Sequence, residues 1–154
     1  MTVRNRRHCR TVANVSAYLS EWVRQQPEPR GEVLTGEIGV RLDPASESHV
    51  GIDVAYISPE LSEATPEEAV WVAGVPVLTV EILSPSDTVQ DIMEKVNAYV
   101  TAGVVAAWVL NPYDRTLAIH RHGRAVRVLG ADERVEGEDY LPGFAVGIAE
   151  LFDK

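Results

Sequence analysis

Residues 77–110 read VLTVEILSPSDTVQDIMEKVNAYVTAGVVAAWVL and predict a strand, a helix and a second strand. The first and last seven residues of this stretch are nearly all apolar and rich in β-branched side chains, which is typical of strands buried on both faces. Between them, Ile92, Val96 and Tyr99 recur at helical spacing, and Gly103 stands where a left-handed cap residue ends a helix. Because such a crossover is almost always right-handed and joins parallel strands, the stretch predicts the centre of an α/β sheet.

The rest of the chain adds elements on both sides of this unit. Its apolar patterns predict a helix at 8–24, paired strands at 38–42 and 50–57, short helices near 66–70 and from 149 onward, and a hairpin of 116–121 with 125–129. In the turn before the central helix, Asp87 is the expected N-cap. With 154 residues and no linker signal, we expect a single domain over residues 1–154, of the mixed α/β (α+β) class.

The chain is acidic and poor in lysine. It carries twelve arginines and two lysines, Lys95 and Lys154, against 23 acidic residues, for a net charge of −9. Proteins that bind nucleic acid usually present a basic surface, so this charge argues against tight binding, although arginines gather at 4–10 and 115–127. The sequence shows no membrane span or signal peptide, and its single cysteine, Cys9, forms no internal disulfide, so we expect a cytoplasmic protein with no membrane partner.

Three ionisable residues stand where apolar or neutral residues are expected. Glu81 interrupts the first buried strand of the central unit, and Asp53 interrupts the predicted strand at 50–57 in the same way. An unpaired carboxylate in such a place costs several kcal/mol by order of magnitude, so each should meet a cation. Lys95 lies in the helix that follows Glu81, four residues after Asp91 and therefore on the same helix face.

Two interpretations of these residues are open. Carboxylates on adjacent strands with a lysine close by can hold Mg²⁺ or Mn²⁺ and position a water for attack on a phosphodiester. The same residues also fit a structural arrangement, with an ion pair between Asp91 and Lys95, Asp53 at a strand end, and Glu81 paired with an arginine. On chemistry alone the structural interpretation is preferred.

Several short runs follow one another in a characteristic order and spacing. They are IDVAYI at 52–57, VLTVEILSPSDT at 77–88, Asp91 with Lys95 and Tyr99, WVLNP at 108–112, PGF at 142–144 and AELF at 149–152. In this order the chain resembles the Uma2 family over about residues 8–152. That family, also called DUF820, belongs by similarity to the PD-(D/E)xK restriction endonuclease-like group.

The resemblance implies a restriction endonuclease-like core, with a mixed central β-sheet flanked by helices, and a metal-dependent nuclease that cleaves nucleic acid, DNA more than RNA. It implies that Asp53 and Glu81 ligate Mg²⁺ or Mn²⁺ together with the main-chain carbonyl of Ile82. The lysine of the parent motif normally stands two residues after the glutamate, where this chain has Leu83. The family supplies the amine from the following helix, which points to Lys95 as the third catalytic residue.

Further expectations follow from the resemblance. Lys95 should orient the attacking water and stabilise charge on the phosphate. Asp91, Ser84 and Ser86 should support the site, the serines through turn and capping contacts. The acidity of the chain, and not the resemblance, leads to the expectation of a homodimer, since a symmetric pair can bring the arginine-rich hairpin at 115–127 beside the other subunit's site.

The chain departs from the family pattern at two places. Ile52 stands where the family usually has proline, a change that should be tolerated because proline is not a ligand, and a segment with a glutamate ahead of the first helix is expected to be absent. The absent segment, the net charge of −9 and the acidic loop from Glu60 to Glu68 favour an alternative hypothesis, a catalytically inactive interaction module that retains the fold and holds a structural metal. The histidines, His8 among them, are scattered and predict no site, and Cys9 is interpreted as a helix residue without a partner base.

Overall fold

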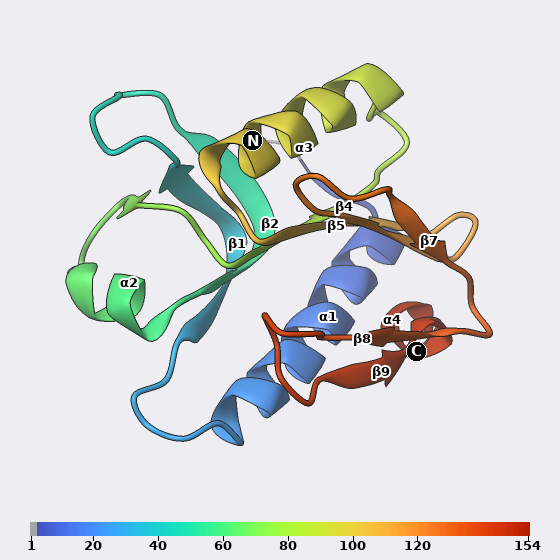
Figure 1. The fold of residues 1–154 in the computed structure, drawn as a ribbon. Helices are drawn as coiled ribbons and strands as arrows, with labels where there is room; N and C mark the ends of the chain where they lie inside the picture. The colour runs from blue at the N-terminus through green and yellow to red at the C-terminus, as the bar shows by residue number, and fades with distance from the viewer. Residues whose placement is uncertain (1–2) are drawn as a thin grey trace.

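The computed structural model describes residues 3–154, whose strands form one large and one small β-sheet (Figure 1). The large sheet has seven strands in the order β3-β1-β2-β4-β5-β6-β7, and the small sheet pairs β8 with β9. The strands are β1 (Glu32–Arg41), β2 (Val50–Ile57), β3 (Val72–Ala73), β4 (Leu78–Ile82), β5 (Ala106–Asn111), β6 (Thr116–His120), β7 (Arg127–Leu129), β8 (Arg134–Glu136) and β9 (Ala145–Gly147). The helices are α1 (Arg6–Arg24), α2 (Pro59–Ala64), α3 (Val89–Ala102) and α4 (Ile148–Phe152).

The predicted strand, helix, strand unit is β4, α3 and β5, at the centre of the large sheet. β4 and β5 are parallel, with Leu78 opposite Ala106 at the start of the pairing. Gly103 ends α3 with a φ of 108°, in the left-handed region that a glycine adopts without penalty. The expected N-cap was wrong, because the Thr88 side chain, and not that of Asp87, accepts a hydrogen bond from the first turn of α3.

β1 and β2 are antiparallel, and their pairing carries a bulge opposite Asp53. The register shifts between Thr35 and Ile38, so two residues of β1, Gly36 and Glu37, stand opposite the single residue Asp53. Their φ angles are 91° and 60°, and only the glycine takes such an angle without steric penalty. Thr35 Oγ1 donates a hydrogen bond of 2.9 Å to the main-chain carbonyl of Asp53. The bulge and this bond together set the backbone from which the Asp53 carboxylate projects.

The large sheet separates two apolar clusters, with α1 on one face and α3 on the other (Figure 1). Leu19 and Trp22 of α1 pack on one face, together with α4, and Tyr99 of α3 packs on the other. Successive residues of a strand face opposite ways, so Val54 belongs to the α1 cluster and Ala55 to the α3 cluster. The two helices that contribute to the site therefore approach β2 and β4 from opposite faces.

Other differences from the sequence patterns lie in the connections. The short helix expected near 66–70 was wrong, because those residues form turns; the short helix of this connection is α2, which Ser58 caps and whose first position Pro59 occupies. The patterns do not predict β3, β8 or β9, since each is only two or three residues long. Within residues 3–154, none of the helices has the length and apolar character needed to cross a bilayer.

Candidate active site

Asp53 and Glu81 meet where β2 and β4 separate. The last paired residues of these strands are Val54 and Val80, each adjacent in the chain to one of the two acids. Both acids are buried, with 7% and 5% of their surface exposed. Beyond the last pair, the Ile82 N–H donates a hydrogen bond of 2.9 Å to Asp53 Oδ2, so the aspartate side chain occupies the place of a strand partner. The predicted neighbouring carboxylates therefore line one cleft, together with Ile82.

The Glu81 carboxylate is held by two residues of α3 that lie one turn apart. Lys95 Nζ is 3.4 Å from both carboxylate oxygens, and it also contacts the Gly51 carbonyl at 3.3 Å. The Tyr99 hydroxyl donates a hydrogen bond of 2.5 Å to Glu81 Oε1. The ion pair formed by Lys95 is with Glu81, and the surface pair with Asp91 is not among the ion pairs of residues 3–154. Asp91 instead lines the cleft beside Lys95.

Glu81 has a strongly perturbed acidity. Burial is the largest cause and raises its pKa, and the negative charge of Asp53 acts in the same direction. The Lys95 charge and the Tyr99 hydroxyl oppose this, and the resulting pKa is about 7 against an ordinary value of 4.5. Burial and the Glu81 charge also raise the pKa of Tyr99, which therefore stays a hydrogen-bond donor. Glu81 thus exchanges its proton close to neutral pH.

Asp53 is held from the other side, by His8 of α1. His8 Nε2 lies 3.2 Å from Asp53 Oδ2, and the His8 ring is 4% exposed. Burial on its own raises the pKa of Asp53. Hydrogen bonds from His8 and the Ile82 N–H, with the charges of His8 and Arg4, outweigh burial and hold this pKa below its usual value of 3.8.

The interpretation of His8 as an unconnected residue was therefore wrong, because helix packing joins positions that are distant in sequence. His8 and Asp53 are 45 residues apart in the chain. One signal was present: His8 lies on the buried stripe of α1, which continues through Thr11, Val15 and Leu19. A histidine in that stripe needs a polar partner, and Asp53 is that partner.

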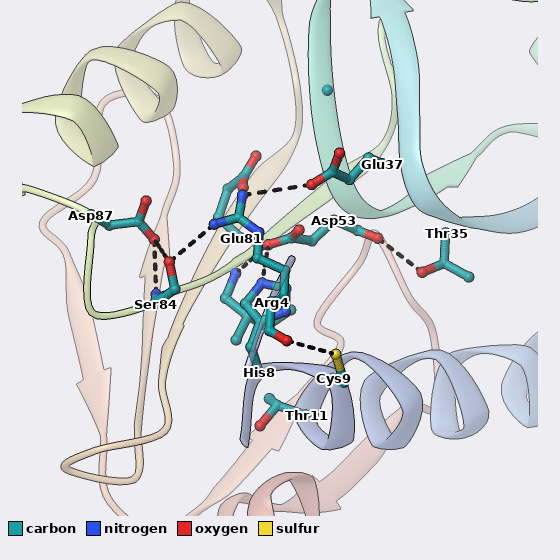
Figure 2. A network of polar contacts seen from close by, with 12 residues as sticks. Arg4, His8, Cys9, Thr11, Thr35, Glu37, Asp53, Glu81, Ser84 and Asp87 are labelled. Carbon is teal, nitrogen blue, oxygen red and sulfur yellow. Dashed lines mark hydrogen bonds and ion pairs between the residues drawn. The ribbon is translucent and has the colours of Figure 1, made fainter. Parts of the chain in front are cut away.

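Arg4 connects the bulge of β1 with the loop after β4 (Figure 2). Arg4 Nη1 donates a hydrogen bond of 3.0 Å to Ser84 Oγ, and Nη2 lies 3.6 Å from Glu37 Oε1. Asp87 Oδ2 accepts hydrogen bonds from the N–H and the hydroxyl of Ser84, at 2.8 and 3.0 Å. Ser84 thus lies at the rim of the cleft, and Ser86 reaches it only through a contact of 3.4 Å with Ser84 Oγ.

The cleft around the two acids is small and predominantly acidic. Its volume is about 190 Å³, and five carboxylates line it against two cationic side chains. The acids are Asp53, Glu81, Asp87, Asp91 and Glu94, and the cations are Arg4 and Lys95. This excess of carboxylates repels an anion such as a phosphate unless a cation also binds in the cleft.

The oxygen atoms at the centre of the cleft suit a hard divalent cation. Two carboxylates and a main-chain carbonyl are the donors that magnesium and manganese prefer, with water completing the coordination. Asp53 Oδ2 already accepts two hydrogen bonds, whereas no residue in 3–154 donates one to Oδ1. No three His, Cys, Asp or Glu side chains within residues 3–154 lie close enough together to ligate one metal ion. The side-chain donors of such a site are therefore limited to Asp53 and Glu81.

Two comparisons with known proteins match the chain. The sequence model of the Uma2 family, described as "Putative restriction endonuclease", matches residues 1–149. No curated protein matches the sequence. Among solved structures, the chain is similar to "a putative nuclease belonging to DUF820" from Anabaena variabilis ATCC 29413, with 17% identity and a TM-score of 0.82. This similarity covers 98% of this chain and 83% of that chain, and it confirms the predicted mixed sheet with flanking helices.

Proposed function

This chain belongs to the Uma2 family, and we propose that it is a metal-dependent nuclease that hydrolyses phosphodiester bonds of nucleic acid, DNA more readily than RNA. The family is described as "Putative restriction endonuclease" and the similar solved structure as "a putative nuclease", and both descriptions support this proposal. The observation that carries it is the contact of Lys95 with Glu81, beside Asp53, in one cleft. The three residues come from β2, β4 and α3, so the fold brings them together from separate parts of the chain.

The two carboxylates are proposed to hold Mg²⁺ or Mn²⁺ with the main-chain carbonyl of Ile82. When bound, such a cation supplies Lewis acidity toward the phosphate and offsets the negative charge of the cleft. Asp53 is ready for this role because it is ionised across the neutral range. Glu81 must give up its proton first, which its pKa of about 7 permits under ordinary conditions.

Lys95 is proposed to act on the water and the phosphate. Its ammonium group has three N–H donors, and its contacts with Glu81 and the Gly51 carbonyl fix it at the wall of the cleft. The Lys95 side chain is 37% exposed, so a substrate can reach it. From this position Lys95 can orient the attacking water and stabilise the charge that develops on the phosphate oxygens.

A nuclease screen with a matched lysine control tests the proposal. The protein is incubated with Mg²⁺ or Mn²⁺ and with duplex DNA, single-stranded DNA and RNA. We expect cleavage by the unaltered protein, a loss of at least about 100-fold in Lys95→Ala, and no change in Lys154→Ala. The two lysines of the chain thus serve as test and control. Cleavage that survives in Lys95→Ala would refute the proposed role of this site.

The acidic cleft also favours a second candidate function, an interaction module without catalysis that holds a structural metal. The excess of carboxylates over cationic side chains in the cleft favours a cation beside Asp53 and Glu81, and the net charge of −9 disfavours a polyanionic substrate. This candidate predicts that Mn²⁺ raises the melting temperature while no nucleic acid is cleaved. Cleavage that depends on Lys95 excludes it.

A further inference from the structure

Arg4 lies where the acidic cleft meets a second hollow beside the start of α1. This second hollow has a volume of about 380 Å³, and the residues that line both hollows are Arg4 and Asp53. The first turns of α1 and the bulge at Gly36 and Glu37 form its other walls. Figure 2 shows the guanidinium group between Glu37 and Ser84, close to Asp53. A chain molecule lying over Asp53 and extending into both hollows therefore passes Arg4.

The Arg4 guanidinium has more donors than its present contacts use. It carries five N–H groups, of which Nη1 donates to Ser84 Oγ, while the approach of Nη2 to Glu37 is long at 3.6 Å. Arg4 Nε is buried and has no acceptor among residues 3–154. Glu37 is 57% exposed, so its ion pair with Arg4 is weak and easily exchanged. A phosphate group offers the paired oxygens that a guanidinium fork prefers.

The arginines near 115–127 are less available for an anion. Ion pairs within the chain already engage three of them: Arg115 with Asp153, Arg121 with Glu138 and Asp139, and Arg124 with Glu138. This region also lies apart from the cleft in the lining of a separate hollow. The positive charge next to the two acids comes from Lys95 and from Arg4.

Arg7 extends the positive charge of Arg4 along α1. Its guanidinium lies 5.0 Å from the centre of the Tyr113 ring, at the turn that follows β5. Asn5 donates a hydrogen bond to the Tyr113 hydroxyl, so the start of α1 is attached to this turn. Arg6 and Arg7 are both exposed. Arg4 therefore places positive charge at the cleft, and Arg7 places it at the neighbouring turn after β5.

We propose that Arg4 binds a phosphate group of the substrate strand next to the phosphate that is cleaved, and that Arg7 contacts a further phosphate along the same strand. This inference rests on the proposed function, because it requires a nucleic-acid strand to lie across Asp53. It accounts for how so acidic a protein can hold a polyanion: two arginines compensate locally for the charge of the cleft. It also assigns a use to Arg4 Nη2, whose approach to Glu37 is long at 3.6 Å.

Salt-dependent binding without turnover tests this role. A short fluorescein-labelled DNA duplex is titrated in Ca²⁺ in place of Mg²⁺, and its fluorescence anisotropy is followed between about 50 and 200 mM salt. For Arg4→Gln we expect binding about tenfold weaker and a slope of log affinity against log salt that is smaller by about 0.9. Arg4→Lys keeps the charge and is expected to keep the slope while losing part of the affinity. Arg24→Gln, an exposed arginine at the other end of α1, is the matched control and should change neither.

Glu37→Gln separates anion binding from a bracing role of Arg4. If Arg4 binds phosphate, removing the Glu37 charge leaves affinity unchanged or increases it. The inference is overturned if Glu37→Gln weakens binding as much as Arg4→Gln does, if the salt slope of Arg4→Gln equals that of the unaltered protein, or if the unaltered protein binds no DNA. Cleavage is measured in parallel. If the unaltered protein cleaves nucleic acid but the salt slope is unchanged in Arg4→Gln, this inference is refuted and the proposed function is not. If the salt slope changes in Arg4→Gln but the unaltered protein cleaves nothing, the proposed function is refuted and only the binding of a phosphate by Arg4 stands.

Discussion

The two carboxylates of the cleft are buried to a similar depth, yet their environments shift their acidity in opposite directions. Asp53, 7% exposed, is approached by His8, the Ile82 N–H and the charge of Arg4, and its pKa falls below the usual value. Glu81, 5% exposed, is approached by Lys95 and Tyr99, yet its pKa rises to about 7 because burial dominates. Depth of burial alone therefore does not set the charge of an acid: hydrogen bonds and charges outweigh burial at Asp53 but not at Glu81.

This difference gives the two acids different tasks. Asp53 is ionised throughout the neutral range, so it offers a permanent negative charge to a cation. Glu81 gives up its proton only near pH 7, so a cation must compete with that proton. We therefore propose Asp53 as the fixed ligand and Glu81 as the ligand that makes cation binding depend on pH.

Replacing the fixed ligand should have the largest effect. Asp53→Asn removes the permanent charge while keeping the shape of the side chain, and we expect cleavage to fall by at least about 100-fold. Initial rates on duplex DNA with Mn²⁺ measure this loss. Asp132→Asn changes an exposed aspartate in the same way and should leave the rate unaltered. Equal rates in both variants would contradict the assignment of Asp53.

Removing the charge of Glu81 should change how stability depends on pH. In the metal-free protein the raised pKa of Glu81 contributes to the free energy of unfolding. This stabilisation is complete below pH 4.5 and is lost as the pH rises through about 7. Glu81→Gln should therefore be more stable than the unaltered protein at pH 8, by up to about 3 kcal/mol, and nearly as stable at pH 4.5. Urea unfolding with EDTA across this range measures the difference, with Glu21→Gln as an exposed control. A difference in stability between Glu81→Gln and the unaltered protein that stays constant from pH 4.5 to pH 8 would contradict this prediction.

Replacing His8 tests the surroundings of Asp53, the other acid of the comparison. His8→Ala leaves Asp53 Oδ2 without its histidine donor, so we expect a loss of about 1–3 kcal/mol in the free energy of unfolding. We also expect Mn²⁺ affinity to change by roughly 10- to 100-fold, because residues that orient a metal ligand act on its affinity. His122→Ala, at an exposed histidine, is the control. Wild-type stability and Mn²⁺ affinity in His8→Ala would show that Asp53 does not depend on this contact.

A substitution at the bulge of β1 should have the smallest effect. Thr35→Val removes the hydroxyl that donates to the Asp53 carbonyl, which we expect to lower the free energy of unfolding by about 1 kcal/mol. Thr35→Ser restores the donor and should recover most of the loss in urea unfolding. If valine and serine behave alike, this hydrogen bond does not support Asp53.

The sequence predicted the parts of the fold and site that depend on local pattern. Asp53 and Glu81 stand out because they interrupt apolar strands, and Lys95 because the chain has only one other lysine. The central parallel unit follows from two apolar runs joined by a helix that ends at a glycine. These signals are local, so a single sequence shows them.

The surroundings of Asp53 could not be predicted in the same way, because they depend on how α1 docks and where β1 bulges. His8 and Arg4 reach Asp53 and Ser84 across 45 and 80 residues of chain. No periodic pattern specifies such distances. The bulge at Gly36 was equally hidden, since one extra residue in a strand leaves its apolar alternation almost intact.

Calorimetric titration with Mn²⁺ at pH 6 and pH 8 tests most directly the central claim, that Asp53 and Glu81 share one cation. We expect a single site that binds Mn²⁺ more tightly at pH 8, where Glu81 is ionised, and that is lost in both Asp53→Asn and Glu81→Gln. Binding of equal strength at the two pH values, or binding that either variant leaves intact, would contradict it.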